Sequence, residues 1–288
     1  MTKLTYLDTW KEWCLLNGLH ISGSEVYQRD AATLKKYRED YYKITLHKML
    51  RRAGYEAIEG DTDSKRGAGK KNTAENDGKL EASLSRTKTA IFELALCNDW
   101  EWFVTLTLNP EYYDRKDLIS YKKKLSTWIK NYNRIHKTNI KYLLIPEQHA
   151  DGENWHMHGL MMGLPEEHLR EFTEQERLPI KILIELKRGH RVYTWEAYGK
   201  TFGYITISEI RHLESVSRYI TKYITKDLAK TRIGLNDHLY YCSQGLKRSE
   251  LIYTGQLTKE LDEDFSNEYV KVKTVQSFDE AIAYFVDR

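Results

Sequence analysis

Polar and apolar residues alternate along four short stretches of the chain, which is the period of a half-buried β-strand. In the first stretch Val104, Leu106 and Leu108 share one face, and the residues between them share the other. The four stretches predicted to be strands are 103–108, 141–148, 155–162 and 204–210. The second and third flank Asp151-Gly152, a dipeptide that is typical of the turn in a β-hairpin.

Other stretches carry apolar residues every three or four positions, which is the period of an amphipathic helix. This spacing predicts helices over 117–135 and 214–230, and a helical pattern also runs through 81–98. The aromatic-rich start of the chain, residues 1–58, looks helical as well. The helix over 117–135 places most of its lysines on the faces that the apolar residues leave free.

A polar stretch divides the chain into domains. Residues 60–80 hold almost no large apolar side chain, so they cannot bury enough surface to fold, and we expect a flexible linker. The linker separates a helical N-terminal region, 1–59, from a domain that carries the candidate chemistry, 81–232. Residues 233–288 show short strand signals and a final helix, and we expect a C-terminal extension packed on that domain.

Composition narrows the class of protein only partly. The balance of 41% hydrophobic and 30% charged residues is typical of a globular protein. No apolar run approaches the ~18 residues that cross a bilayer, and the start of the chain lacks a signal-peptide pattern. Cys14, Cys97 and Cys242 are far apart and in no CxxC pair, which disfavours a disulfide framework and a cysteine zinc site. We therefore expect a cytoplasmic protein that does not contact a membrane.

The predicted hairpin brings three metal-binding side chains to one patch. Side chains two residues apart in a strand share a face, so His156 and His158 project together. If the hairpin is symmetric about its turn, Glu147 lies opposite His156, and His149 shares the face of Glu147 as a reserve ligand. Imidazole and carboxylate ligands together suit Mg²⁺, Mn²⁺ or a transition metal such as Zn²⁺. The alternative is a surface hairpin with incidental histidines.

The second informative string is RYITKYITKDLAK, over 218–230, in which one four-residue unit occurs twice. If the string is helical, Tyr219 and Tyr223 lie one turn apart on the same face. A basic stripe at four-residue spacing lies beside them and comprises Arg218, Lys222, Lys226 and Lys230. Positive charge is thus concentrated locally, as a phosphate-binding surface requires, although the net charge is only +3. The alternatives are a strand, which the β-branched residues permit, and a solvated basic helix with structural tyrosines.

The two elements together match one reaction. A tyrosine hydroxyl has a pKa of ~10, so only about one in a thousand is ionised at neutral pH. A metal held by the histidines and Glu147 could polarise a phosphodiester, and Lys222 or Lys226 could stabilise the phenolate. The reaction is transfer of a DNA phosphodiester onto Tyr219 or Tyr223, which leaves a free 3′-hydroxyl and a 5′-phosphotyrosine.

Three strings in order, FVTLTL, WHMHGLMM and RYITKYITKD, resemble the motifs of the HUH endonucleases, and among these the rolling-circle replication initiators of phages and plasmids. His156-Met157-His158 matches the His–hydrophobic–His centre, and Glu147 matches the third ligand. The doubled tyrosine motif is similar to that of the two-tyrosine initiators, in which one tyrosine nicks the origin and its partner acts when the circle is closed. The flanking strings ALCNDWEWFVTLTLNP and LYYCSQGL are similar to the phage-type branch, and the resemblance covers roughly residues 85–250.

The resemblance implies an α+β fold with a central antiparallel sheet of about five strands, the histidine strand in its middle and the tyrosine helix packed across it. It implies a metal-dependent DNA endonuclease and strand transferase with Mg²⁺ or Mn²⁺ as cofactor, acting on single-stranded DNA at a replication origin in a bacterial host cell. No Walker motif is present in the chain, so a host helicase and polymerase are expected as partners.

Further DNA contacts are predicted from charge. They comprise Arg218, Lys230, Lys122, Lys123 and Lys124, and residues 1–59 are a second candidate for DNA binding. Two alternatives remain open: an HUH transposase or relaxase of a mobile element, which uses the same chemistry, and a non-catalytic DNA-binding regulator, which forms no covalent adduct.

Overall fold

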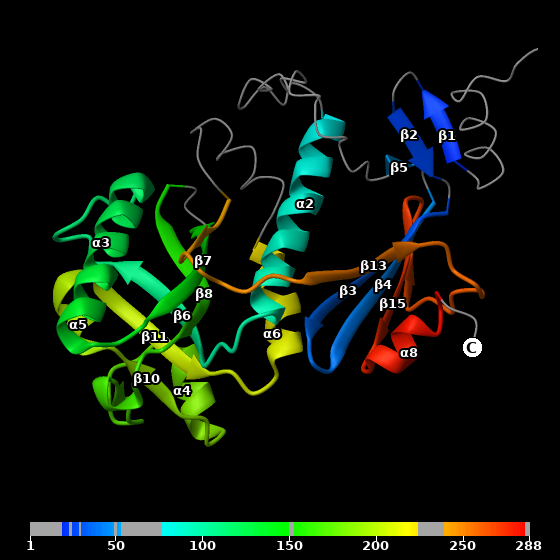
Figure 1. The fold of residues 1–288 in the computed structure, drawn as a ribbon. Helices are drawn as coiled ribbons and strands as arrows, with labels where there is room; N and C mark the ends of the chain where they lie inside the picture. Colours follow the sequence, from blue (N-terminus) through cyan, green and yellow to red (C-terminus); the bar gives the residue numbers. More distant parts are fainter. Residues whose placement is uncertain are drawn as a thin grey trace, which may run out of the picture. The chain divides into compact units, whose positions relative to one another are not determined.

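The computed structural model describes residues 19–22, 25–28, 30–48, 51–52, 77–149, 153–223 and 239–285 (Figure 1). The chain divides into two compact units. One comprises residues 70–248, and the other combines residues 1–69 with 249–288. The described elements are helices and antiparallel strands, so the α+β class is confirmed. Within the described residues, no helix combines the length and the apolar character that a membrane crossing requires.

The unit of residues 70–248 is built on a seven-stranded sheet with the order β12-β7-β8-β6-β11-β10-β9. Its long strands are β6 (Trp102–Leu108), β7 (Lys141–Gln148), β8 (Trp155–Met162) and β11 (Gly203–Glu209). The short strands towards its edges are β12 (Tyr241–Cys242), β10 (Val192–Thr194) and β9 (Arg170–Glu171). All neighbouring strands run antiparallel, and the histidine strand β8 lies between β7 and β6, well inside the sheet.

Helices cover both faces of this sheet (Figure 1). On one side lie α3 (Leu118–His136) and α5 (Glu196–Thr201), and on the other α2 (Asp77–Leu96) packs against α6 (Leu213–Ile220). The remaining helical elements are η1 (Glu166–His168), α4 (Ile180–Lys187) and η2 (Thr221–Tyr223). The alternation in β6 explains the arrangement: Val104, Leu106 and Leu108 are buried, whereas the intervening residues are only partly buried.

Helix α3 forms where the pattern predicts. Its buried stripe comprises Leu118, Tyr121, Leu125, Ile129 and Tyr132, at the spacing of one helix face. The side chain of Asp117 caps its N-terminus by accepting a hydrogen bond from the backbone N–H of Ser120, 3.0 Å away. The helix is tied to α5 by a 2.6 Å hydrogen bond between the buried hydroxyls of Tyr121 and Tyr198.

The other unit contains a five-stranded sheet with the order β13-β3-β4-β15-β14. Its elements are β3 (Ala32–Arg38), β4 (Tyr41–His47), β13 (Glu250–Gly255), β14 (Phe265–Ser266), β15 (Val270–Val275) and α8 (Phe278–Ile282). Its core includes Leu34, Ile44, Val275, Tyr284 and Phe285. A separate three-stranded sheet joins β1 (Leu19–Ser22), β2 (Glu25–Gln28) and β5 (Arg51–Arg52).

The prediction of a helical N-terminal region is wrong for the described residues before 53, because they form strands. In β3 the buried side chains of Ala32 and Leu34 alternate with Thr33 and Lys35, which is a strand period, and the β-branched residues of β4 favour the same state. The abundance of tyrosines in this region drew attention away from that alternation.

The C-terminal residues pair with the N-terminal strands. Strand β13 is hydrogen-bonded to β3 and β15 to β4, so residues 249–288 form one unit with the start of the chain. The expectation that an extension packs on the domain 81–232 is corrected accordingly. Sheet pairing between segments more than 200 residues apart leaves no local signature in the sequence. Most of the predicted linker 60–80 lies outside the described residues, and its last four residues begin α2.

Candidate active site

The hairpin of β7 and β8 has the predicted register. Glu147 pairs with His156 and Ile145 pairs with His158, while β6 places Thr105 directly opposite His158 on the other side. Met157, between the two histidines, is fully buried, so the histidines point to the opposite face. The register therefore depends on apolar residues that must stay in the core, since a one-residue slip would exchange the two faces.

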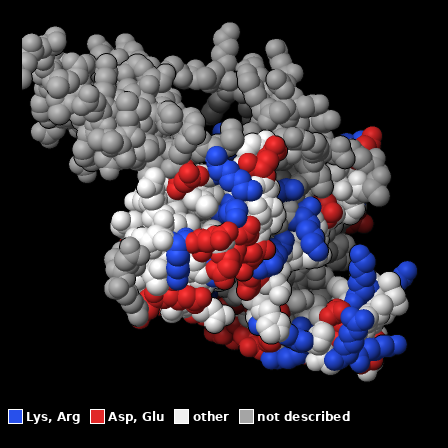
Figure 2. Space-filling model, turned by 90° about the vertical axis from the view of Figure 1, so that its right-hand side faces the viewer, with Lys and Arg blue, Asp and Glu red and all other residues white. Residues whose placement is uncertain are grey.

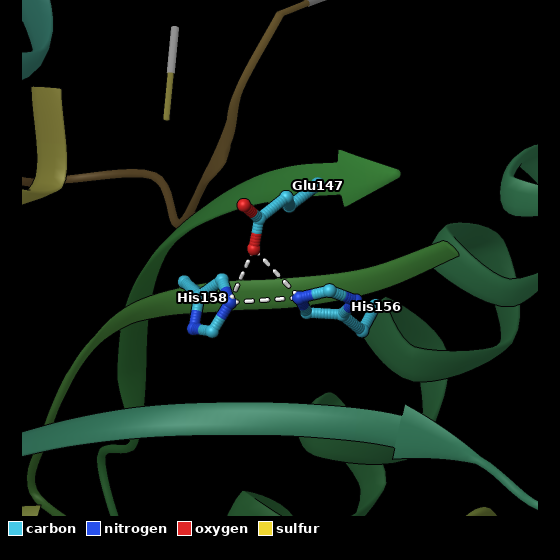
Figure 3. Close-up of side chains that lie close together, drawn as sticks. All are labelled: Glu147, His156 and His158. Carbon is cyan, nitrogen blue, oxygen red and sulfur yellow. Dashed lines mark hydrogen bonds and ion pairs between the residues drawn. The ribbon is translucent and has the colours of Figure 1, made fainter. Parts of the chain in front are cut away.

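Three side chains converge on this face (Figure 3). The Oε2 atom of Glu147 lies 2.7 Å from Nε2 of His156 and 2.7 Å from Nε2 of His158, and the two Nε2 atoms are 2.8 Å apart. All three side chains are partly buried. Among the described residues, this is the one group of His, Cys, Asp or Glu side chains close enough together to hold a metal ion. Two imidazoles and a carboxylate fit Mn²⁺ or Zn²⁺ best and accommodate Mg²⁺.

Neighbouring groups orient the two imidazoles differently. The Nδ1 atom of His158 is 3.0 Å from Oγ1 of Thr105, a contact that leaves Nε2 facing Glu147. The Nδ1 atom of His156 is buried and has no hydrogen-bond partner among the described residues. His149, the predicted reserve ligand, lies beside the cluster with its ring centroid 4.3 Å from that of His156. Its Nε2 is 2.7 Å from the guanidinium of Arg115, so it is held outside the group.

Burial keeps both ligand histidines neutral at physiological pH. It lowers the pKa of His156 below its ordinary value, although the hydrogen bond to Glu147 acts in the opposite direction. It lowers the pKa of His158 to about 4, assisted by the charge that His156 acquires on protonation. Neutral imidazoles are the form that binds a metal.

Both tyrosines of the doubled motif lie at this cluster. The ring of Tyr223 stacks on His158 with centroids 4.2 Å apart and planes 13° apart. The hydroxyl of Tyr223 donates a 2.8 Å hydrogen bond to that of Tyr219, whose ring packs edge-on against Phe103 at 5.8 Å. Burial raises the pKa of Tyr223. The helix carrying them begins as predicted, but α6 ends at Ile220 and a tight turn, η2, carries Tyr223; residues 224–238 lie outside the described residues.

The predicted cations are distributed less uniformly. The ammonium of Lys222 lies 5.6 Å above the ring of Tyr219, whereas Arg218 is exposed and pairs with Glu214 at 2.6 Å. Lys226 and Lys230 lie outside the described residues. Lys122, Lys123 and Lys124 belong to α3, on the far side of the sheet from α6 (Figure 1).

A cavity of about 700 Å³ opens over the histidines and tyrosines. Its walls include three residues that the sequence patterns did not single out: Lys181 of α4, and Tyr204 and Thr206 of β11. The alternation of β11 places Tyr204 and Thr206 on one face and could have identified them, since Thr206 pairs with Thr105. Nothing in the local pattern around Lys181 indicates that it reaches the cavity.

The family comparison covers the same elements that build this cavity. Residues 101–228 match the model of a family of replication-associated proteins of the ORF2 type. The match begins just before β6 and runs past Tyr223, so it includes the histidine strand and both tyrosines. The resemblance to replication initiators is thereby confirmed at the level of a replication-associated protein family. Comparison with curated proteins and with solved structures gives no match.

Proposed function

We propose that the chain is a rolling-circle replication initiator that nicks and rejoins single-stranded DNA at an origin through a 5′-phosphotyrosine. The observation that carries the proposal is the stacking of Tyr223 on His158, because it brings a nucleophile into contact with a candidate metal ligand. A metal site without a nearby nucleophile, or a basic helix without a metal site, would not favour this chemistry over DNA binding alone.

The reaction exchanges one ester for another. The phenolic oxygen of Tyr219 or Tyr223 attacks the phosphorus of a phosphodiester, a tyrosine–phosphorus bond forms, and the bond from phosphorus to the 3′ oxygen breaks. The phenol gives up a proton and the 3′ oxygen gains one, so a free 3′-hydroxyl is left. Attack by a 3′-hydroxyl on the phosphotyrosine reverses these changes and joins the strand. Two adjacent tyrosines permit one to remain linked while the other attacks.

Glu147, His156 and His158 are the residues that would hold a divalent metal, with Mg²⁺ or Mn²⁺ as the expected ion. Such an ion polarises a phosphate oxygen as a Lewis acid. Thr105 orients His158, and the low pKa values of both histidines keep their nitrogens available to a metal. Lys222 is placed to favour the phenolate of Tyr219, and Lys226, Arg218 and Lys230 are proposed to contact phosphates.

A covalent adduct is the decisive test. A labelled single strand that carries the origin is incubated with protein and Mn²⁺ and then run on a denaturing gel. The wild type should shift the label, and mass spectrometry of the adduct should locate the nucleotide on Tyr219 or Tyr223. The double variant Tyr219→Phe/Tyr223→Phe should form no adduct, whereas Tyr112→Phe, an exposed tyrosine elsewhere in the same unit, should behave as the wild type.

The outcomes separate the alternatives. A double variant that still nicks would show that another residue is the nucleophile, and activity that survives a chelator would remove the metal. Binding without an adduct would identify a non-catalytic regulator. An HUH transposase or relaxase would form the same adduct but on the ends of a mobile element or a transfer origin, so the DNA sequence that is cut distinguishes these. Host helicase and polymerase remain the expected partners in replication.

A further inference from the structure

A second hollow lies on the other side of the sheet from the tyrosines. It is a groove of about 530 Å³ between α3 and the edge formed by β7 and β12. Three lysines from two elements line it: Lys122 and Lys130 of α3, and Lys141 at the start of β7. Tyr240 and Tyr241 form the opposite wall. The groove therefore joins segments that are far apart in the sequence.

The electrostatic character of this groove is one-sided. No Asp or Glu is among the described residues that line it, and α3 contains no acidic residue along its whole length. None of the three lysines forms an ion pair with a described residue. This contrasts with the near balance of 45 Lys and Arg against 42 Asp and Glu in the chain, and with the face in Figure 2, where both signs are interleaved. Unpaired cations that converge in a hollow indicate an anionic ligand.

The lysines are held in place. The ammonium of Lys122 lies 4.7 Å over the ring of Tyr241, and that of Lys141 donates a 3.0 Å hydrogen bond to the backbone oxygen of Gly245. Both side chains are half-buried, whereas Lys130 is exposed at the rim. A rigid duplex could reach the rim, but a single strand can bring its phosphates to the half-buried lysines and place bases beside the tyrosines.

We propose that this groove binds single-stranded DNA that leads away from the nicking site. The inference rests on the proposed function and extends it by naming a path for the strand. Lys141 and Glu147 stand six residues apart on β7, which spans ~20 Å at the rise of a strand. This distance corresponds to about six nucleotides at the ~3.4 Å spacing of a stacked strand. Strands with a flank of that length on one side of the nick reach both sites.

The groove also divides the predicted lysine cluster of α3. Lys122 lies in the groove, whereas Lys123 and Lys124 line a different hollow beside Trp128, with the ammonium of Lys124 5.0 Å over the ring of Tyr113. The double variants Lys122→Ala/Lys130→Ala and Lys123→Ala/Lys124→Ala remove the same charge from the same helix. They therefore form a matched pair that distinguishes a groove from a uniformly basic helix.

The experiment measures binding of fluorescent oligonucleotides by anisotropy, in full-length protein that carries Tyr219→Phe/Tyr223→Phe so that no strand is cut. Lys122→Ala/Lys130→Ala should weaken binding of a single strand with a long flank at least about fivefold and lower the salt slope by about 1.4. Lys123→Ala/Lys124→Ala should weaken it less than about twofold, and Lys122→Arg/Lys130→Arg should retain affinity. Circular dichroism checks that each variant is folded.

Equal losses in the two Ala pairs, or equal losses for single strands and duplexes, would overturn the groove. The result is independent of the nicking chemistry. If the protein forms no adduct but the groove variant still loses affinity selectively, the proposed function fails and the groove stands. If the wild type nicks and the groove variant binds long strands as well as its matched partner, the groove fails and the proposed function stands.

Discussion

The ring of Tyr223 lies flat on the imidazole of His158, with centroids 4.2 Å apart, and its hydroxyl is hydrogen-bonded to that of Tyr219. The contact joins a tight turn after α6 to a strand more than 60 residues earlier, and it covers a side chain that would otherwise face the cavity. One aromatic ring thus connects the candidate nucleophiles with the candidate metal ligands, and it also contributes to the burial that governs His158.

The stack should control the protonation of His158. In metal-free protein Tyr223→Ala should raise the pKa of His158 from about 4 towards its ordinary value, because water regains access to the imidazole. Tyr223→Phe keeps the ring and should leave the pKa low. The chemical shifts of the His158 ring protons, followed by NMR against pH, measure both. An unchanged pKa in Tyr223→Ala would mean that the sheet alone buries the imidazole.

The same shift has a consequence for stability. Because the pKa of His158 is lowered in the folded state, the unfolded chain takes up a proton first as the pH falls. Stability of metal-free protein should therefore be full above the ordinary histidine pKa and decline between about pH 6.5 and about pH 4. Tyr223→Ala, in which the two pKa values are closer, should show a smaller decline in urea unfolding across that window.

Thr105 should matter for metal affinity although it is not a ligand. Its Oγ1 lies 3.0 Å from Nδ1 of His158 and orients the imidazole. Thr105→Val, which removes the hydroxyl and keeps the shape, should weaken metal binding about 10- to 100-fold, and Thr105→Ser should restore it. Calorimetric titration with Mn²⁺ and Zn²⁺ measures the affinity. Equal affinity in Thr105→Val would assign the orientation of His158 to Glu147 and the stacked ring instead.

Gly159, next to His158, should tolerate no side chain. A Cβ atom there would overlap the backbone oxygen of Leu143 and would lie 2.5 Å from a methyl group of Leu144. Gly159→Ala should therefore cost about 3 kcal/mol in the free energy of unfolding. The control is Gly199→Ala in α5, where nothing lies within 4 Å of the added Cβ and the substitution should stabilise by ~0.5–1 kcal/mol. Denaturant unfolding that shows no difference between them would contradict the packing of β7 on β8.

The unit that joins both ends of the chain should respond to acid through Asp262. Its carboxylate accepts hydrogen bonds from Lys273, at 2.7 Å, and from Tyr284, and these contacts lower its pKa to about 2. A lowered carboxyl pKa contributes stability that is present above the ordinary value and is lost as the pH falls from about 4 to about 2. Asp262→Asn and Lys273→Met should both flatten the dependence of the melting temperature on pH in this range. An unchanged dependence would show that the pair is fully screened by water.

The residues of the metal cluster could be predicted because a strand has a strict two-residue period. Once Asp151-Gly152 is taken as the turn, Glu147 must face His156, and the structure has this register. The same reasoning predicted the core face of β6 and the apolar stripe of α3. It failed for β3 and β4, where a run of tyrosines was taken as helical although the burial alternates.

Local sequence therefore determined which residues share a face: the ligand set on the hairpin, the two tyrosines one turn apart, and the lysines of α3. Only the tertiary structure decided which faces meet. It stacked Tyr223 on His158, brought Lys181 to the cavity, separated Lys122 from its neighbours, and paired the C-terminal strands with β3 and β4. The physical reason is that periodicity acts through bonds between neighbouring residues, whereas contacts between distant segments depend on how all buried surfaces pack at once.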